Sequence, residues 1–286
     1  MLGAEPAAET VVSSYGVRVV LQASDDGALA RLVAALPGRW NHDGGARAPR
    51  VYGLTVRRRG RPRYVLRSDG EELARADHFE PILEALTGSV GFYVAESTST
   101  RTFVHAGVVG WGGRAIVVPG KQNSGKTTLT AALVRAGATY LSDEYAPFDD
   151  RARVDPFPRP LSVRQPDGVS VRLHEVEALG GVRETRRLPV GLVVLAPYTG
   201  VRRWRPRSLT GGEAVLAMLA HTVTAQTKPR QALERLATVA VSARVLQGNR
   251  GDAEETAQAV IRRLEAAVEE SSTREWPPTH PISRGS

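Results

Sequence analysis

Apolar and polar residues alternate along several short segments of this chain, and such alternation predicts β-strands with one buried face. One segment, 190–196, is apolar throughout, which is typical of a strand buried on both faces. The segments with a strand pattern are 17–22, 51–56, 63–66, 102–109, 114–119, 138–141 and 190–196.

Apolar residues recur three and four positions apart in other segments, and this spacing predicts helices. Ser24-Asp25-Asp26 is a typical N-cap for the first of them, which ends at Leu36, and Gly137 is a typical stop after the helix at 127–135. The remaining predicted helices cover 78–95, 211–222, 230–239 and 252–269.

The order of these elements predicts an α/β protein in two parts. A small α+β domain is expected over 1–98, and a strand–helix alternation typical of an α/β core covers 99–270. We expect a disordered start over 1–10 and a disordered, proline-bearing tail over 271–286.

The composition excludes several kinds of site. The 286 residues include no cysteine, so disulfides, thiolate catalysis and cysteine-ligated metals are ruled out. Glu5 and Glu9 stand where a signal peptide would carry basic residues, and the apolar run 190–197 is much shorter than a membrane-spanning helix. These features predict a cytoplasmic protein without a membrane partner.

The formal net charge of +8 comes mostly from arginine, because only Lys121, Lys126 and Lys228 are lysines. Such an excess suits anionic partners such as nucleotides, and it is equally typical of a solvated arginine-rich surface. The arginine cluster at 57–63 fits either a charged hairpin tip or a nucleic-acid contact, but no aromatic residues are interleaved with it. Nucleic acid is therefore not the favoured partner.

Residues 120–127 read Gly-Lys-Gln-Asn-Ser-Gly-Lys-Thr and satisfy the P-loop (Walker A) pattern G-x-x-x-x-G-K-[ST], between a predicted strand and a predicted helix. In this pattern the glycines let backbone N–H groups face phosphate oxygens, the lysine reaches the β- and γ-phosphates, and the Thr127 hydroxyl ligates Mg²⁺. The predicted nucleotide-binding residues are Gly120, Lys121, Gln122, Asn123, Ser124, Gly125, Lys126, Thr127 and Thr128.

A carboxylate that acts on the nucleophile or the metal is expected at the carboxyl end of a neighbouring strand. The segment 138–141 leads into Asp143 and Glu144, which form either a catalytic pair or a solvated acidic turn. We expect their strand to lie beside the strand 114–119, so that Asp143 faces Lys126.

His105 lies in the apolar strand before the loop. A histidine in such a strand is either a hydrogen-bonded core residue or a functional one. A second undecided segment is 180–187, rich in glycine and arginine, which is either a lid over the γ-phosphate and acceptor or a plain surface loop.

In these spacings the chain resembles the HPr kinase/phosphorylase family and its HPr-kinase-like relatives. His105-Ala106 precedes Gly120 by fifteen residues, and Asp143 follows Lys126 by seventeen. The acid pair here is Asp-Glu rather than the family's Asp-Asp. The family's downstream signature, with its Glu-Ile-Arg-Gly core, is absent, which does not favour phosphorylase activity.

The resemblance implies a nucleotide-binding core of the phosphoenolpyruvate carboxykinase-like type that uses ATP and Mg²⁺. It implies phosphoryl transfer to a hydroxyl, with Asp143 as general base, Glu144 as an acid beside the metal and His105 as a catalytic residue that helps to orient the attack. Lys126 is a further catalytic residue on the strength of the P-loop pattern. HPr-kinase-like relatives act in peptide-modification pathways, including lasso-peptide clusters, so a serine of a protein or precursor peptide is the expected acceptor.

Two alternatives stay open from the sequence. One is a nucleotide-binding regulatory switch that hydrolyses slowly or not at all, and the other is a kinase of a small-molecule alcohol. The sequence also leaves a homo-oligomer open.

Overall fold

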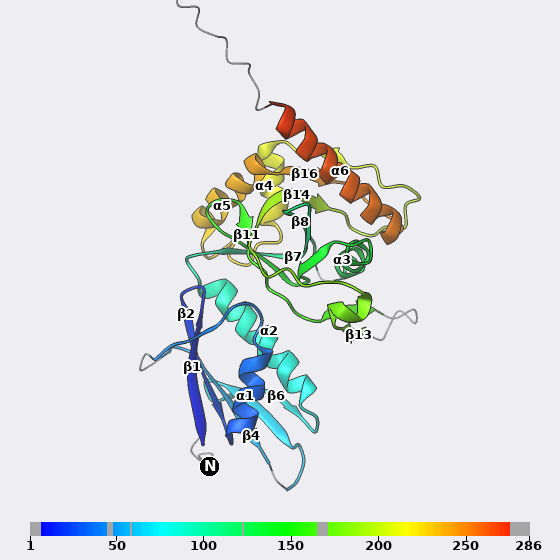
Figure 1. Cartoon of the computed structure of the whole chain (residues 1–286). Helices are drawn as coiled ribbons and strands as arrows, with labels where there is room; N and C mark the ends of the chain where they lie inside the picture. Colours follow the sequence, from blue (N-terminus) through cyan, green and yellow to red (C-terminus); the bar gives the residue numbers. More distant parts are fainter. Residues whose placement is uncertain (1–6, 45–47, 58, 122, 165–170, 275–286) are drawn as a thin grey trace, which may run out of the picture.

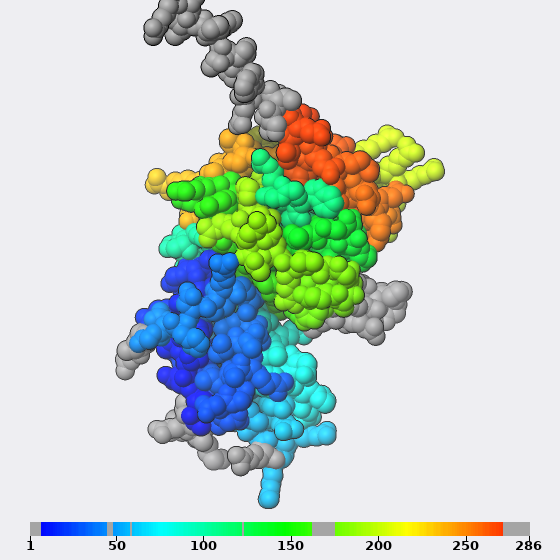
Figure 2. Space-filling view, in the orientation of Figure 1, coloured from blue at the N-terminus to red at the C-terminus, as the bar shows by residue number. Residues whose placement is uncertain are grey.

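The computed structural model describes residues 7–44, 48–57, 59–121, 123–164 and 171–274. Within them the chain forms two large sheets with helices packed on both (Figure 1). In the space-filling view the first part of the chain, drawn in blue and cyan, lies directly against the green-to-red second part (Figure 2). The mixed α/β character predicted from the sequence is confirmed, and the division at residue 98 is our proposal.

The first sheet has the strand order β3-β1-β2-β4-β5-β6. Its strands are β1 (Ala8–Ser14), β2 (Val17–Ala23), β3 (Asn41–His42), β4 (Val51–Val56), β5 (Tyr64–Ser68) and β6 (Glu71–Ala76). Helices α1 (Asp26–Ala35) and α2 (Glu80–Ser97) bury Leu32 and Leu86 in the same core as Leu21 of β2. Asp25 caps α1 as predicted, since its side chain accepts a hydrogen bond from Ala28 N at 2.8 Å.

The two ends of the chain differ from the prediction. Residues 8–10, predicted to be disordered, belong to β1, which pairs with β2 along its full length. The prediction was wrong because the polar residues Glu9, Ser13 and Ser14 interrupt the apolar pattern of a strand. The segment forms a strand through its pairing with β2, which the local sequence does not indicate. At the other end, α6 (Ala253–Arg274) includes the first four residues of the predicted tail. Residues 1–6 and 275–286 lie outside the described residues.

The second sheet has the strand order β11-β10-β7-β8-β14-β16-β15, and β9 pairs with β7 beside this path. Strands β8, β14 and β16 run parallel, whereas β7 is antiparallel to its partners. The strands are β7 (Thr102–Trp111), β8 (Arg114–Pro119), β9 (Thr139–Ser142), β10 (Tyr145–Phe148), β11 (Arg153–Val154), β14 (Leu188–Leu195), β15 (Arg207–Ser208) and β16 (Arg244–Gln247). A separate pair, β12 (Leu161–Arg164) and β13 (Val171–His174), precedes a 3₁₀ turn, η1 (Val176–Leu179).

Helices cover both faces of the centre of this sheet. Side chains of α3 (Lys126–Arg135) and α6 share one core, and those of α4 (Gly211–Leu219) and α5 (Pro229–Ser242) share another. The adjacent β14 residues Leu192 and Val193 belong to different cores, and both are fully buried. The apolar run at 190–196 is therefore a strand buried on both faces, as predicted. Of the helices in the described residues, none is long and apolar enough to cross a lipid bilayer.

The strand that leads to Asp143 does not lie where the sequence predicted. β9 pairs with β7, and β7 separates β9 from β8. The predicted adjacency is wrong because β7, ten residues long, pairs with β8 along one edge and with both β9 and β10 along the other. Residues 143–144 form the short link between β9 and β10, opposite the middle of β7.

The arginine cluster at 57–63 lies at the end of the hairpin formed by β4 and β5. Arg57 N donates a hydrogen bond to Arg63 O at 2.8 Å, and the described arginines of the cluster are exposed. Residue 58 lies outside the described residues. This geometry is that of a charged hairpin tip.

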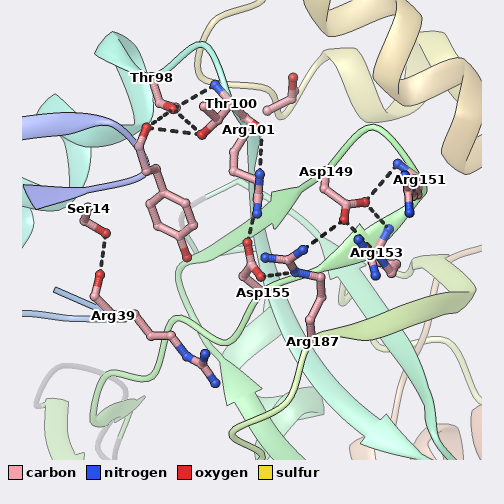
Figure 3. Close-up of polar contacts among 12 residues, drawn as sticks. Ser14, Arg39, Thr98, Thr100, Arg101, Asp149, Arg151, Arg153, Asp155 and Arg187 are labelled. Atoms are coloured by element: carbon pink, nitrogen blue, oxygen red, sulfur yellow. Dashed lines mark hydrogen bonds and ion pairs between the residues drawn. The ribbon is translucent and has the colours of Figure 1, made fainter. Parts of the chain in front are cut away.

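A charged network joins the two parts of the chain. Arg101 and Arg187 both donate to the buried carboxylate of Asp155, with Arg101 Nε 2.5 Å from Oδ2 (Figure 3). Arg187 also lies 3.4 Å from the carboxylate of Asp149. The guanidinium of Arg101 lies over the ring of Tyr15, which comes from the turn between β1 and β2. The network therefore connects the first sheet with the segments that precede β7 and β14.

Lys228 holds the carboxyl end of α2. Its Nζ donates to the carbonyl oxygens of Glu96, Ser97 and Thr98 at 2.7, 2.9 and 2.9 Å. A positive charge at this helix end is favourable, and the last carbonyls of a helix have no partner within it.

We expect Lys228→Met to lower the free energy of unfolding by about 1 to 2 kcal/mol, because the charge and its hydrogen bonds are lost while the apolar stem remains. Urea denaturation measures this change. Arg230→Met removes an exposed positive charge two residues away and should change the same quantity by less than about 0.5 kcal/mol. Equal losses in the two variants would contradict the capping role.

Candidate functional site

A cleft of about 2270 Å³ opens where β8 and β14 end. The loop between β8 and α3 lines it, together with the 143–144 link, the turn 220–223 after α4 and the segment 198–202 after β14. A further wall comes from α2 of the first part of the chain. Open parallel sheets bind ligands at the carboxyl ends of their strands, so this cleft is the candidate site.

The predicted phosphate-binding loop connects β8 directly to α3, as its motif requires. A Cβ on Gly120 would lie 2.3 Å from Ser124 Oγ, so the loop turns back closely on this glycine, and a larger residue here would displace the Ser124 hydroxyl. Asn123 and Gly125 have φ angles of 65° and 83°, in the left-handed region. Gly125 is the N-cap of α3 and provides no side-chain cap, so the first N–H groups of the helix have no capping side chain. This is the arrangement that receives anions at a helix N-terminus.

The predicted loop residues fall into three groups. Lys121, Asn123, Gly125, Lys126, Thr127 and Thr128 line the cleft. Gly120 is buried behind them, and Ser124 N donates to Lys121 O at 3.2 Å to close the turn. Gln122 lies outside the described residues.

Asp143 lies against the start of α3, although its strand is not adjacent to β8. A Cβ on Gly107 of β7 would lie 3.6 Å from Asp143 Oδ1 and 2.0 Å from Thr130 Oγ1. Because Gly107 has no side chain, the Asp143 carboxyl and Thr130 of α3 can both pack against β7 at this position. The prediction that Asp143 faces Lys126 fits this geometry, since the charge of Lys126 and the Thr127 hydroxyl both act on the carboxyl.

The carboxyl of Asp143 is buried, and its Oδ1 has no hydrogen-bond partner among the described residues. The nearby Thr130 hydroxyl is engaged, since it donates to Lys126 O at 2.9 Å. Burial raises the pKa of Asp143 to about 7, against the opposing influence of Thr127 and Lys126. An unpartnered acceptor oxygen beside the predicted phosphate-binding loop suits either a general base or a metal ligand.

Glu144, predicted to stand beside the metal, is engaged elsewhere. Its carboxylate forms an ion pair with Arg159, and both side chains are partly buried. Arg159 also donates to the Thr87 hydroxyl of α2 at 3.1 Å. Glu144 would reach a metal only after this pair opens, and its metal role stays a prediction.

His105 and His221 lie together at the cleft. His105 N donates to His221 O at 2.8 Å, and both side chains line the cleft. Burial, reinforced by the positive charges of Lys126 and, for His221, Lys121, lowers the pKa of both imidazoles and so favours their neutral forms. Nδ1 of His221 is buried and has no partner among the described residues. His221 belongs to no spacing motif, so sequence analysis missed it.

Arg250 is a second residue that sequence analysis missed. Only 1% of it is exposed, and its Nη2 donates to Gly125 O at 2.6 Å. A Cβ on Gly125 would lie 2.6 Å from that Nη2, so the glycine serves both the left-handed turn and this contact. Arg250 follows β16, far from the loop in sequence, and no local pattern marks it.

The segment 180–187 is anchored rather than free. Tyr140 N donates to Val182 O, and Glu184 N donates to Tyr140 O, both at 2.8 Å. Arg183 lines the cleft but forms ion pairs with two nearby glutamates. These contacts favour the surface-loop alternative over a lid.

The donor set fits a magnesium nucleotide better than a protein-held metal. Among the described residues, no group of three or more histidine, aspartate or glutamate side chains is placed to hold a metal ion. Mg²⁺ commonly takes one or two protein ligands and completes its shell with phosphate oxygens and water. The Thr127 hydroxyl, which lines the cleft, suits that role.

Comparison with known proteins gives a distant structural likeness. No family model matches the chain, and no curated protein matches it. Among solved structures, the HPr(Ser) kinase/phosphatase from Coxiella burnetii is similar at 12% sequence identity and a TM-score of 0.32, over 60% of this chain and 97% of that one. At this level, function has to be argued from the residues of this chain.

Proposed function

We propose that this protein is a Mg-ATP-dependent phosphotransferase that moves the γ-phosphoryl group of ATP to a hydroxyl, the serine of a protein or peptide. The observation that carries the proposal is the buried Asp143 carboxyl, with Oδ1 unpartnered among the described residues, beside Lys126 and Thr127 at the start of α3. A loop that only bound phosphate would not need a buried carboxylate next to it.

The loop and the first turn of α3 bind the triphosphate. Backbone N–H groups and the positive end of the helix dipole attract the phosphate oxygens, and Lys126 adds a full positive charge. The Thr127 hydroxyl would hold Mg²⁺, and the metal would supply Lewis-acid stabilisation of the phosphate charge.

Asp143 accepts the proton of the acceptor hydroxyl. As that proton leaves, the acceptor oxygen bonds to the γ-phosphorus, and the bond between the γ-phosphorus and the β–γ bridging oxygen breaks to release ADP. A proton acceptor with a pKa near 7 is well matched to neutral pH. His105, neutral at the cleft, orients the acceptor by a hydrogen bond.

The test is nucleotide binding and transfer by a Lys126→Ala variant. We expect the dissociation constant for Mg-ATP, measured by calorimetry, to rise at least tenfold, because a charge-assisted contact to the phosphates is lost. Transfer from ³²P-labelled ATP to a serine-containing peptide library should fall to background.

Arg230→Ala is the matched control, since it removes one exposed positive charge outside the cleft and should bind Mg-ATP as the wild type does. Wild-type affinity in the Lys126 variant would exclude the proposed phosphate site. ATP turnover by the wild type without any phosphorylated peptide or small alcohol would instead indicate the regulatory switch.

A further inference from the structure

Tyr198 is an exposed aromatic residue in the wall of the cleft. It follows β14 and lines the cleft beside the loop, yet 62% of it is exposed. A large aromatic side chain that lies in a polar cleft with this much free surface has area available for a ligand.

The backbone of Tyr198 is joined to the loop. Tyr198 N donates to Ser124 O at 3.0 Å, and a Cβ on Gly125 would lie 3.2 Å from Tyr198 Cβ. The Tyr198 side chain therefore starts beside the loop that is proposed to bind the phosphates.

A buried cation, Arg250, lies on one side of the Tyr198 ring. The Arg250 guanidinium lies 5.5 Å from the ring centroid, and its Nη1 and Nη2 donate to Gly251 O and Gly125 O. Arg250 N donates to Pro197 O, and Thr199 N donates to Arg250 O, so the residues on both sides of Tyr198 are held by backbone bonds. With its backbone held and a cation on one side of its ring, Tyr198 has less conformational freedom to lose when a planar group stacks on it.

We propose that Tyr198 is the stacking platform for the purine base of the nucleotide whose phosphates occupy the loop. This inference rests on the nucleotide site proposed above. Bases stack on aromatic faces whatever their hydrogen-bonding edges, so the platform supplies affinity without selecting adenine over guanine. Phe92, also exposed and aromatic among the described residues of the cleft, lies on α2 in the first part of the chain, away from the loop in sequence.

The experiment compares two ligands that share the phosphates but not the base. Calorimetry with Mg²⁺ gives the dissociation constants of ATP and of inorganic tripolyphosphate for the wild type, Tyr198→Ala, Tyr198→Phe and Phe92→Ala. We expect Tyr198→Ala to weaken ATP binding about tenfold and to leave tripolyphosphate binding within twofold of the wild type. Tyr198→Phe keeps the ring and should bind both ligands as the wild type does, and so should Phe92→Ala.

Four results would overturn the inference. Equal weakening of ATP and tripolyphosphate in Tyr198→Ala would mean that the residue holds the loop rather than the base. Unchanged ATP affinity in that variant, or a selective loss of ATP affinity in Phe92→Ala, would exclude the platform. A wild type that binds neither ligand would instead reject the nucleotide site itself, and the inference with it.

Discussion

Asp143→Asn should lower phosphoryl transfer by about 10²- to 10⁴-fold, the range typical of losing a general base, while Mg-ATP still binds. The substitution keeps the size of the side chain and removes its basicity. Transfer is followed with ³²P-labelled ATP and a serine-containing peptide library, and binding is followed by calorimetry. Transfer at the wild-type rate would show that Asp143 is not the base, and loss of ATP binding together with transfer would make it a metal ligand instead.

The same variant should be more stable than the wild type at alkaline pH. Because the pKa of Asp143 is raised by burial to about 7, the folded protein binds a proton more tightly than the unfolded chain does. Stability contributed by the protonated carboxyl is therefore present below the unfolded pKa of about 4 and is lost as the pH rises toward 7.

Asparagine carries no such charge, so the free energy of unfolding of the ligand-free Asp143→Asn variant should exceed that of the wild type by on the order of 2 to 4 kcal/mol at pH 8. At pH 4 the difference should nearly vanish. Urea denaturation at the two pH values measures it. Asp150→Asn alters an exposed carboxylate in the same part of the chain and should show neither the gain in stability nor the loss of transfer. A variant less stable than the wild type at pH 8 would contradict the cost of burying this carboxylate.

Asp155→Ala should reduce the free energy of unfolding by about 3 to 5 kcal/mol. It removes the carboxylate that pairs with both Arg101 and Arg187. The partly buried Arg101 guanidinium then has no carboxylate partner, whereas the more exposed Arg187 keeps Asp149 at 3.4 Å. Deleting one partner of a buried ion pair lowers the free energy of unfolding strongly, because the remaining charge is shielded from water and has lost its counter-ion. The measurement is again denaturant unfolding.

Glu254→Ala provides the control, since it breaks the well-exposed pair with Arg135 and should change stability by less than about 1 kcal/mol. If the two variants lose the same stability, the network between the two parts of the chain contributes no more than a surface ion pair.

Predictions from the sequence held where the evidence is local. The loop at 120–127 joins β8 to α3, and the run at 190–196 is a strand buried on both faces. The N-cap of α1 at Asp25 was also predicted from the sequence, because a capping side chain accepts a hydrogen bond from a backbone N–H within three residues of itself.

Predictions failed where a partner distant in sequence decides the structure. Residues 8–10 form a strand only because β2 lies beside them. Arg250 and His221 reach the cleft by the packing of the segments after β16 and α4, and no spacing near the loop reveals them.

The sequence by itself determined that a loop with the P-loop pattern connects a strand to a helix, and that an acid pair begins seventeen residues after the lysine of that loop. Glycines, a lysine and a hydroxyl in this order are properties of neighbouring residues. Only the tertiary structure decided which of the two acids is buried without a partner and which is ion-paired. β7 pairs with β8 on one edge and with β9 and β10 on the other, and Gly107 leaves room between them, so Asp143 is buried with Oδ1 unpartnered among the described residues. Glu144, one residue later, meets Arg159 instead. The physical reason is that burial and pairing depend on which strands are neighbours in the sheet, and the order of residues along the chain does not specify that.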